Sequence, residues 1–155
     1  MVSLRHFAGQ LLVLGVMFFF SGNAQAQTYF LTGGPELTHE QRANVFAYVK
    51  NAWQIADGRS ATDLEAHRRW ARGQTAAVVN GEVDYLVDQT MAKVRRLGTD
   101  RLQQVFAYIK QGAVIAGNME EGHTLELHLN WASEQTEETL RSEIVRIALA
   151  GYKAF

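Results

Sequence analysis

The chain of 155 residues has no cysteine and a single proline, and neither sign of charge predominates. Without cysteine it has no disulfide bond, no cysteine nucleophile and no lipid anchor of the lipoprotein type. The 15 basic residues are balanced by 16 acidic ones, giving a formal net charge of −1 at pH 7. Because the two signs are interleaved along the chain, the sequence lacks the basic face that nucleic acids or anionic lipid surfaces require.

No apolar run is long enough to predict a membrane-spanning helix. The longest, from Phe7 to Phe20, covers about fourteen residues, whereas a spanning helix needs roughly twenty. Arg5-His6 precedes this run, and the small residues of Ala24-Gln25-Ala26 follow it at the positions that a signal peptidase reads. The pattern predicts a cleaved signal peptide over residues 1–26, with an uncleaved anchor as the alternative. A periplasmic or secreted protein is therefore expected.

After cleavage, the chain is predicted to be a short arm followed by one domain. Gly33-Gly34-Pro35 separates an extended segment, residues 28–32, from the rest of the sequence, and Gly and Pro clusters of this kind mark loops. We interpret residues 27–37 as an N-terminal arm or linker. Residues 38–155 are numerous enough to bury one core without a disulfide or a structural metal, so a single domain is expected.

Two stretches of the sequence occur twice. LEAHRRWARGQT at residues 64–75 shares seven of its twelve positions with LELHLNWASEQT at residues 125–136. VFAYVK at 45–50 returns as VFAYIK at 105–110, with five of six positions identical. At average amino-acid frequencies, chance gives fewer than about one match in twelve positions. The chain is therefore predicted to be an internal duplication of a unit of about sixty residues, with copies at 38–98 and 99–155.

The apolar residues of each copy recur with the period of a helix. Starting at Val45 in the first copy and at Val105 in the second, they follow one another at steps of three and four positions. Two units are too few for an open solenoid, which usually needs three or more. The sequence therefore predicts an all-α fold, a compact helical bundle made of two tandem three-helix repeats related by a pseudo-twofold axis.

Capping and turn residues predict where the helices begin and end. The predicted starts carry a threonine together with a second capping residue, at Thr38 with Gln41, Thr62 with Glu65 and Thr99 with Asp100. The predicted ends carry glycine: Asn80-Gly81 ends the second helix near Val79, and Gly98 supplies a left-handed cap to the third helix, Glu82–Leu97. The last helix is expected over residues 137–153.

TLELHLNW, residues 124–131, carries a conflicting pattern. Its leucines alternate with polar residues, as in a half-buried strand. The first copy has Ala66 and Arg68 where the second has Leu127 and Leu129, so the residues common to both copies follow a helical period. We therefore predict a helix for this segment, with a strand as the alternative.

The residues common to both copies fall on one face of the predicted helix, because they lie three or four positions apart. With a tyrosine from each preceding helix, they are the candidate ligand-binding residues: His67, His128, Trp70, Trp131, Gln74, Gln135, Tyr48 and Tyr108. One interpretation is a buried polar cluster whose members satisfy one another, since a buried group left unpaired costs about 1 to 3 kcal/mol. The other is a pocket at the pseudo-twofold axis, where the two histidines approach each other and bind a ligand.

A metal site is not predicted. The two histidines have no histidine partner four residues away and no adjacent carboxylate, which is an incomplete ligand set. Glu65 and Glu126 precede the histidines by two positions, and this spacing points them elsewhere on a helix. The sequence also lacks the nucleophilic serine motif and the phosphate-binding glycine loop. We expect no metal, no cofactor and no catalysis, with an enzyme that uses the paired histidines as the alternative.

Two further groups of polar residues receive no function. His39 and His123 lie near predicted helix starts, have no partner that the sequence identifies, and are expected to be exposed. The arginines between residues 68 and 72 are expected to form a solvated face paired with Glu65 and Asp63.

One short motif resembles a known family. LTHEQ at residues 37–41 is similar to the LTxxQ motif of the small helical periplasmic stress chaperones. The resemblance covers these five residues, and that family is expected to carry the motif twice, so no function is taken from it. The sequence predicts instead a small exported binding or interaction protein. Its partner would be another exported protein or a small ligand, not a nucleic acid, and no stable membrane anchor would remain after cleavage.

Overall fold

A computed structural model describes residues 36–152 and residue 155, and the regular structure within them is helical, with no strand. The elements are α3 (His39–Ala56), α4 (Leu64–Arg72), α5 (Ala76–Lys93), the 3₁₀ turn η2 (Val94–Arg96), α6 (Thr99–Ala116), α7 (Leu125–Ser133) and α8 (Glu137–Gly151). The all-α prediction is confirmed, and residues 125–131 are helical. The predicted signal peptide and most of the predicted arm lie outside the described residues.

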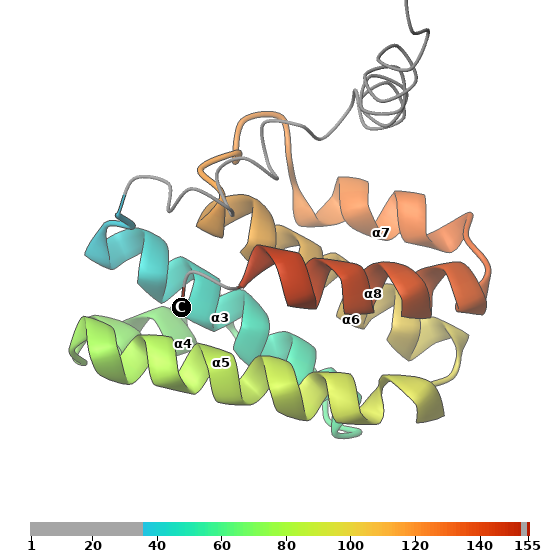
Figure 1. Ribbon diagram of the computed structural model, residues 1–155, viewed down its shortest axis with the longest axis horizontal. Helices are drawn as coiled ribbons and strands as arrows, with labels where there is room; N and C mark the ends of the chain where they lie inside the picture. Colours follow the sequence, from blue (N-terminus) through green and yellow to red (C-terminus); the bar gives the residue numbers. More distant parts are fainter. Residues whose placement is uncertain (1–35, 153–154) are drawn as a thin grey trace, which may run out of the picture.

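Helices α3 and α6 form the centre of the bundle. The most extensive contact joins these two helices, while α3 also packs against α4 and α5, and α6 against α7 and α8. In Figure 1 the first three helices lie mostly in the lower part of the view and the last three in the upper part. Helices α5 and α8 touch each other over a small area only. None of the helices described is both long and apolar enough to cross a membrane.

The core follows the apolar stripes predicted for α3 and α6. The buried residues of these stripes include Val45, Val49 and Ile55 in α3 and Val105, Ile109 and Ile115 in α6. Helices α5 and α8 cover them with Val79, Val83 and Leu86 and with Leu140, Ile144 and Ile147. Each aliphatic side chain buried in this way contributes about 1.5 to 3 kcal/mol. The bundle is therefore held mainly by its two central helices and the two long helices that cover them.

Gly112 allows a close contact between α6 and the residue that follows α8. The hydroxyl of Tyr152 donates a hydrogen bond to the carbonyl of Ile109 at 2.5 Å, and a Cβ at position 112 would overlap this hydroxyl. Burial raises the pKa of Tyr152 above its usual range, so the hydroxyl keeps its proton and remains a donor. The contact fixes the end of α8 against the centre of the bundle.

The predicted boundary between the second and third helices is wrong. The helix predicted from Thr62 to Val79 is two helices, because α4 ends at Arg72 and the hydroxyl of Thr75 caps the start of α5. Asn80-Gly81 lies inside α5, where the Asn80 side chain accepts a hydrogen bond from Arg42. A glycine inside a helix costs only about 1 kcal/mol, which the packing of α5 offsets.

One of the predicted helix caps is present in the structure, and the others are not. Thr38 and Gln41 form the expected capping box. Helix α4 is capped by Asp63 rather than by Thr62. Gly98 precedes α6 with a φ of −78° and without a side-chain cap, so neither the left-handed cap nor the threonine cap predicted there is present. Helix α8 ends at Gly151, two residues before the predicted end.

Candidate functional site

Trp70 on α4 and Trp131 on α7 each pack against a phenylalanine of the central helices. The ring of Trp70 stacks on Phe46 with centroids 4.7 Å apart, and that of Trp131 packs on Phe106 at 4.8 Å. The two tryptophans are 42% and 40% exposed. The interpretation of the shared face as a buried cluster therefore does not hold for the two tryptophans. Helices α4 and α7 cover only one side of α3 and α6, so each indole has one covered and one open face.

His67 on α4 is held by polar side chains of α3. Its Nε2 lies 3.1 Å from Asn51 Oδ1 and 3.2 Å from Gln54 Oε1, and because both oxygens are acceptors, this nitrogen carries the proton. Asn51 is buried and exchanges two hydrogen bonds of 2.9 Å with the backbone of Thr62. Gln54 Oε1 also accepts the Thr62 hydroxyl at 3.0 Å. This is a satisfied polar cluster, and it holds the segment before α4 against α3.

His128 on α7 has different neighbours, although the repeat matches it to His67. Gln111 stands at the position of Asn51, and Val114 at that of Gln54. Valine offers no acceptor, and Gln111 Oε1 and His128 Nε2 are both buried without a hydrogen-bond partner in the described part of the chain. The polar cluster between α6 and α7 is therefore unsatisfied where that between α3 and α4 is complete.

A hollow of about 380 Å³ opens beside His128, between α6, α7 and α8. Its apolar lining consists of Phe106, Leu127 and Trp131. Its charged lining consists of Lys110, Glu143 and Arg146, and Gly122, His123 and His128 complete it. The volume lies within the range of about 300 to 1,000 Å³ that is usual for small-molecule sites. The mixture of apolar walls and a few polar groups is also typical of such sites.

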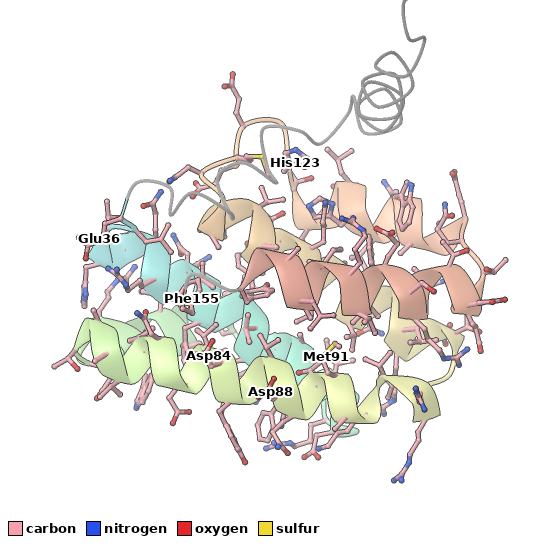
Figure 2. The ribbon with its side chains drawn as sticks, in the orientation of Figure 1. Glu36, Asp84, Asp88, Met91, His123 and Phe155 are labelled. Carbon is pink, nitrogen blue, oxygen red and sulfur yellow. The ribbon has the colours of Figure 1, made fainter. Side chains whose placement is uncertain are left out.

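His123 packs against His128. Their ring centroids are 5.5 Å apart, with 27° between the ring planes, and His123 is exposed, as expected. Figure 2 shows His123 just before α7, at the upper side of the molecule. Gly122 has a φ of +76°, a conformation that favours glycine, and this turn leads the chain into His123. Burial, then Lys110 and His123, lower the pKa of His128 to about 4, so its ring is uncharged at neutral pH.

The charged residues of the hollow form one ion pair and leave one cation. Arg146 Nε lies 3.1 and 3.2 Å from the two carboxylate oxygens of Glu143, and its Nη2 lies 2.7 Å from one of them. Arg146 thereby holds the pKa of Glu143 below its usual value. Lys110 has no carboxylate within ion-pair distance among the residues described. Burial lowers the pKa of Lys110, with Arg146 adding to the effect and Glu143 opposing it.

The other candidate residues lie away from the hollow. Tyr48 and Tyr108 meet where α3 and α6 cross, with ring centroids 6.1 Å apart. Gln135 donates to the carbonyl of Trp131 at 3.3 Å, and Gln74 is half-buried. The structure thus brings two of the predicted residues, His128 and Trp131, into the hollow, and His67 is not among the residues that line it.

The arginines of α4 form an exposed ion-pair network, as predicted. Arg72 bonds Glu40 at 2.7 and 2.9 Å and Glu65 at 2.5 Å. Asp63 instead caps the helix. His39 is exposed, as expected, and its Nε2 lies 2.9 Å from the carbonyl of Arg72. The network ties the start of α3 to the end of α4.

Most of the hollow was not foreseen from the sequence. Lys110 corresponds to Lys50 in the first copy, so the repeat does not single it out. Glu143 and Arg146 belong to α8, which packs on α6 as α7 does, and no sequence pattern specifies how these two helices lie relative to each other. A signal was nevertheless present: Gln111 and Val114 replace the two residues that satisfy the first histidine.

No group of three or more histidine, aspartate or glutamate side chains is placed to hold a metal ion within the residues described. Comparisons with protein families, with characterised proteins and with solved structures gave no significant match. Any function must therefore be inferred from the side chains of the hollow and their surroundings.

Proposed function

We propose that the protein is an exported, non-catalytic binding protein that holds a small ligand in the hollow beside His128. The main support is the pair of buried polar atoms, His128 Nε2 and Gln111 Oε1, that have no partner among the described residues. A buried polar group left unpaired costs about 1 to 3 kcal/mol, and the large majority of buried side-chain polar atoms in proteins have a hydrogen-bond partner. His67, the matching histidine on α4, has hydrogen-bond partners. The repeated sequence therefore does not by itself leave its histidine unpaired.

The ion pair of Glu143 argues against a catalytic role for the carboxylate of the hollow. A carboxylate that acts as a catalytic acid or base must be free to exchange a proton with the substrate. Glu143 is the carboxylate of the hollow, and it is engaged by Arg146 through three short contacts. A binding role for the hollow needs no such free group.

We further infer that residues 38–98 and 99–155 are duplicated units related by a pseudo-twofold axis. In each half a long, a short and a second long helix follow one another. Thr75 and Thr136 cap the second long helices in the same way, and the two tryptophan contacts have nearly equal centroid distances. On this basis, the polar cluster around His67 in the first half has a structural role. The matching residues around His128 in the second half belong to the binding site.

Export is inferred from the sequence of residues 1–26, with residues 27–37 as an arm and 38–155 as one domain. The basic start, the short apolar run and the small residues at Ala24 and Ala26 support this inference. If the protein is exported, its ligand is a molecule present in the periplasm or outside the cell.

Native mass spectrometry of protein isolated from the periplasm without refolding tests the binding function. We expect a fraction of the protein to retain one small molecule. Replacing Leu127, which lines the hollow and is 53% exposed, with Trp should fill the hollow and abolish the retained mass. The matched control is Ala66→Trp, at the corresponding exposed position of α4.

The competing outcomes are distinct. A second protein chain in place of a small molecule would favour the alternative of an interaction protein. Equal retention by wild type and Leu127→Trp would contradict the location of the site. A wild-type protein that carries no additional mass, and takes none up from a periplasmic extract, would contradict the binding function itself.

A further inference from the structure

We propose that the ligand of the hollow is a small amphipathic anion, with one carboxylate bound by Lys110 and a flat apolar body lying against Trp131 and Leu127. This inference rests on the proposed binding function and specifies the chemistry of its ligand. It follows from the charges, the walls and the size of the hollow, and from a comparison with the first half of the chain.

The charges of the hollow select an anion. Arg146 and Glu143 compensate each other in a bidentate pair, whereas Lys110 is a partly buried cation that pairs with no carboxylate in the described structure. A buried charge is costly unless a group of opposite charge accompanies it. The uncompensated charge of the lining is therefore a single positive one, on Lys110.

The number of negative charges on the ligand is limited by Glu143. Its carboxylate lines the same hollow as Lys110 and repels a second anionic group. A polyphosphate or a dicarboxylate would need a cluster of free cations, and the hollow offers Lys110 alone. A carboxylate is the simplest group that carries one negative charge and accepts hydrogen bonds from an ammonium group.

The apolar lining selects a flat ligand body. Trp131 is 40% exposed and Leu127 is 53% exposed, and both line the hollow with Phe106. The indole of Trp131 packs on Phe106 with ring centroids 4.8 Å apart, and this contact restricts its orientation. Aromatic rings stack favourably on such a surface, with about 0.5 to 1.5 kcal/mol beyond the area that they bury. An aromatic carboxylate combines this contact with the anionic group.

The first half of the chain shows what Lys110 lacks. Its counterpart, Lys50, lies over the ring of Trp53 at 4.4 Å from the centroid, a cation–π contact that stabilises the ammonium group. In the second half the position of Trp53 is occupied by Ala113, which offers no ring. The same lysine is therefore engaged by the protein in one half and left for a ligand in the other.

Three probes that share one aromatic body test this assignment: indole-3-acetate, indole-3-acetamide and tryptamine, which are anionic, neutral and cationic. They are titrated into the ¹⁵N-labelled mature protein while NMR follows the backbone amides of Gly122 and His123 and the indole N–H of Trp131. We expect indole-3-acetate to shift these signals and to bind about tenfold more tightly than the amide. It should also raise the pKa of His128, because the bound carboxylate compensates Lys110.

Lys110→Gln should reduce the affinity for indole-3-acetate to that for the amide, while the control Lys50→Gln leaves it unchanged. Circular dichroism and melting curves of both variants establish that they fold. Equal affinity for the amide, tighter binding of tryptamine, or unchanged binding by Lys110→Gln would overturn the anionic ligand while leaving the hollow as a site. Failure of all three probes to shift the hollow would overturn the ligand class. The mass-spectrometric experiment separately decides whether the hollow binds a ligand at all.

Discussion

At the scale of single residues, His67 and His128 show how neighbours determine what a repeated side chain can do. His67 donates to the acceptors of Asn51 and Gln54. His128 is only 7% exposed, yet its Nε2 has no partner among the described residues. A difference of two residues on the adjacent helix therefore separates a histidine with a structural role from one at a candidate binding site.

The stability of the protein should fall in mild acid because of His128. Its folded pKa of about 4 lies below the unfolded value of about 6.5, so the unfolded chain binds the proton more tightly and acid favours unfolding. The free energy of unfolding should be unaffected by this group above pH 6.5. It should decline between about pH 6.5 and 4, by about 3 kcal/mol in all. Urea denaturation over this pH range measures the decline.

The contribution of His128 is isolated by replacement with Gln, which does not titrate in this range. His128→Gln should flatten the decline, and His67→Gln should flatten it less, although burial also lowers the pKa of His67. Carboxylates with lowered pKa values, such as Glu143, are protonated at still lower pH. Their protonation lowers the free energy of unfolding of all variants there. A pH profile of His128→Gln that parallels the wild type would show that His128 is not buried uncharged.

The two central amides should differ in their contribution to stability. Asn51→Ala removes the partner of His67 and of both backbone groups of Thr62, and buried groups left unpaired cost about 1 to 3 kcal/mol each. Gln111→Ala removes an amide whose oxygen has no partner among the described residues. We expect Asn51→Ala to lower the free energy of unfolding by about 2 kcal/mol more than Gln111→Ala does. Equal losses would contradict the difference between the two clusters.

At the scale of the elements, the short helices α4 and α7 each attach to a central helix through one side only. Ala71 and Ala132 are fully buried at these contacts, and each tryptophan covers a phenylalanine. The open face of α7 adjoins the hollow, and that of α4 carries the arginine network. Two helices of similar sequence and packing thus present different surfaces.

Trp70→Ala and Trp131→Ala should destabilise the protein to a similar and moderate extent. Full burial would make each loss about 3 to 5 kcal/mol, but with about 40% of each residue exposed we expect about 2 kcal/mol for each. Chemical denaturation of the two variants measures this. A loss for one variant more than twice that for the other would contradict an equivalent placement of the two tryptophans.

The sequence allowed some elements to be predicted better than others, for physical reasons. The stripe from Val45 was sufficient to predict α3, because a long helix with one buried face repeats its pattern many times. The segment from Thr124 was identified as a helix because the first copy excluded a strand. The break at Thr75 was missed since Asn80-Gly81 is the stronger local signal, and packing overrides it. The hollow depends on where α7 and α8 each pack on α6, and contacts between distant segments leave no local pattern.

At the scale of the whole molecule, two central helices carry two outer layers that are alike in construction and different in surface. Asp84 and Asp88, labelled on α5 in Figure 2, correspond to the exposed Val145 and Leu149 of α8. The two halves therefore differ in charge along their long outer helices as well as in their polar clusters. The proposed duplication, followed by divergence of one half, would account for both differences.

Export should leave a mature chain that begins at Gln27. If a signal peptidase reads the small residues at Ala24 and Ala26 as proposed, N-terminal sequencing of periplasmic material should detect Gln27 or its cyclised form. The site of cleavage also sets the length of the arm that precedes α3. Recovery of the intact N-terminus from the membrane fraction would instead establish an uncleaved anchor.

The central claim is that two matched histidines differ because the second adjoins a binding site. Its most direct test is the NMR spectrum of the imidazole nitrogens of His67 and His128, recorded before and after adding the small-molecule fraction of a periplasmic extract. We predict that the His128 signals shift and those of His67 stay in place. Unchanged His128 signals, or equal shifts of both histidines, would contradict the claim.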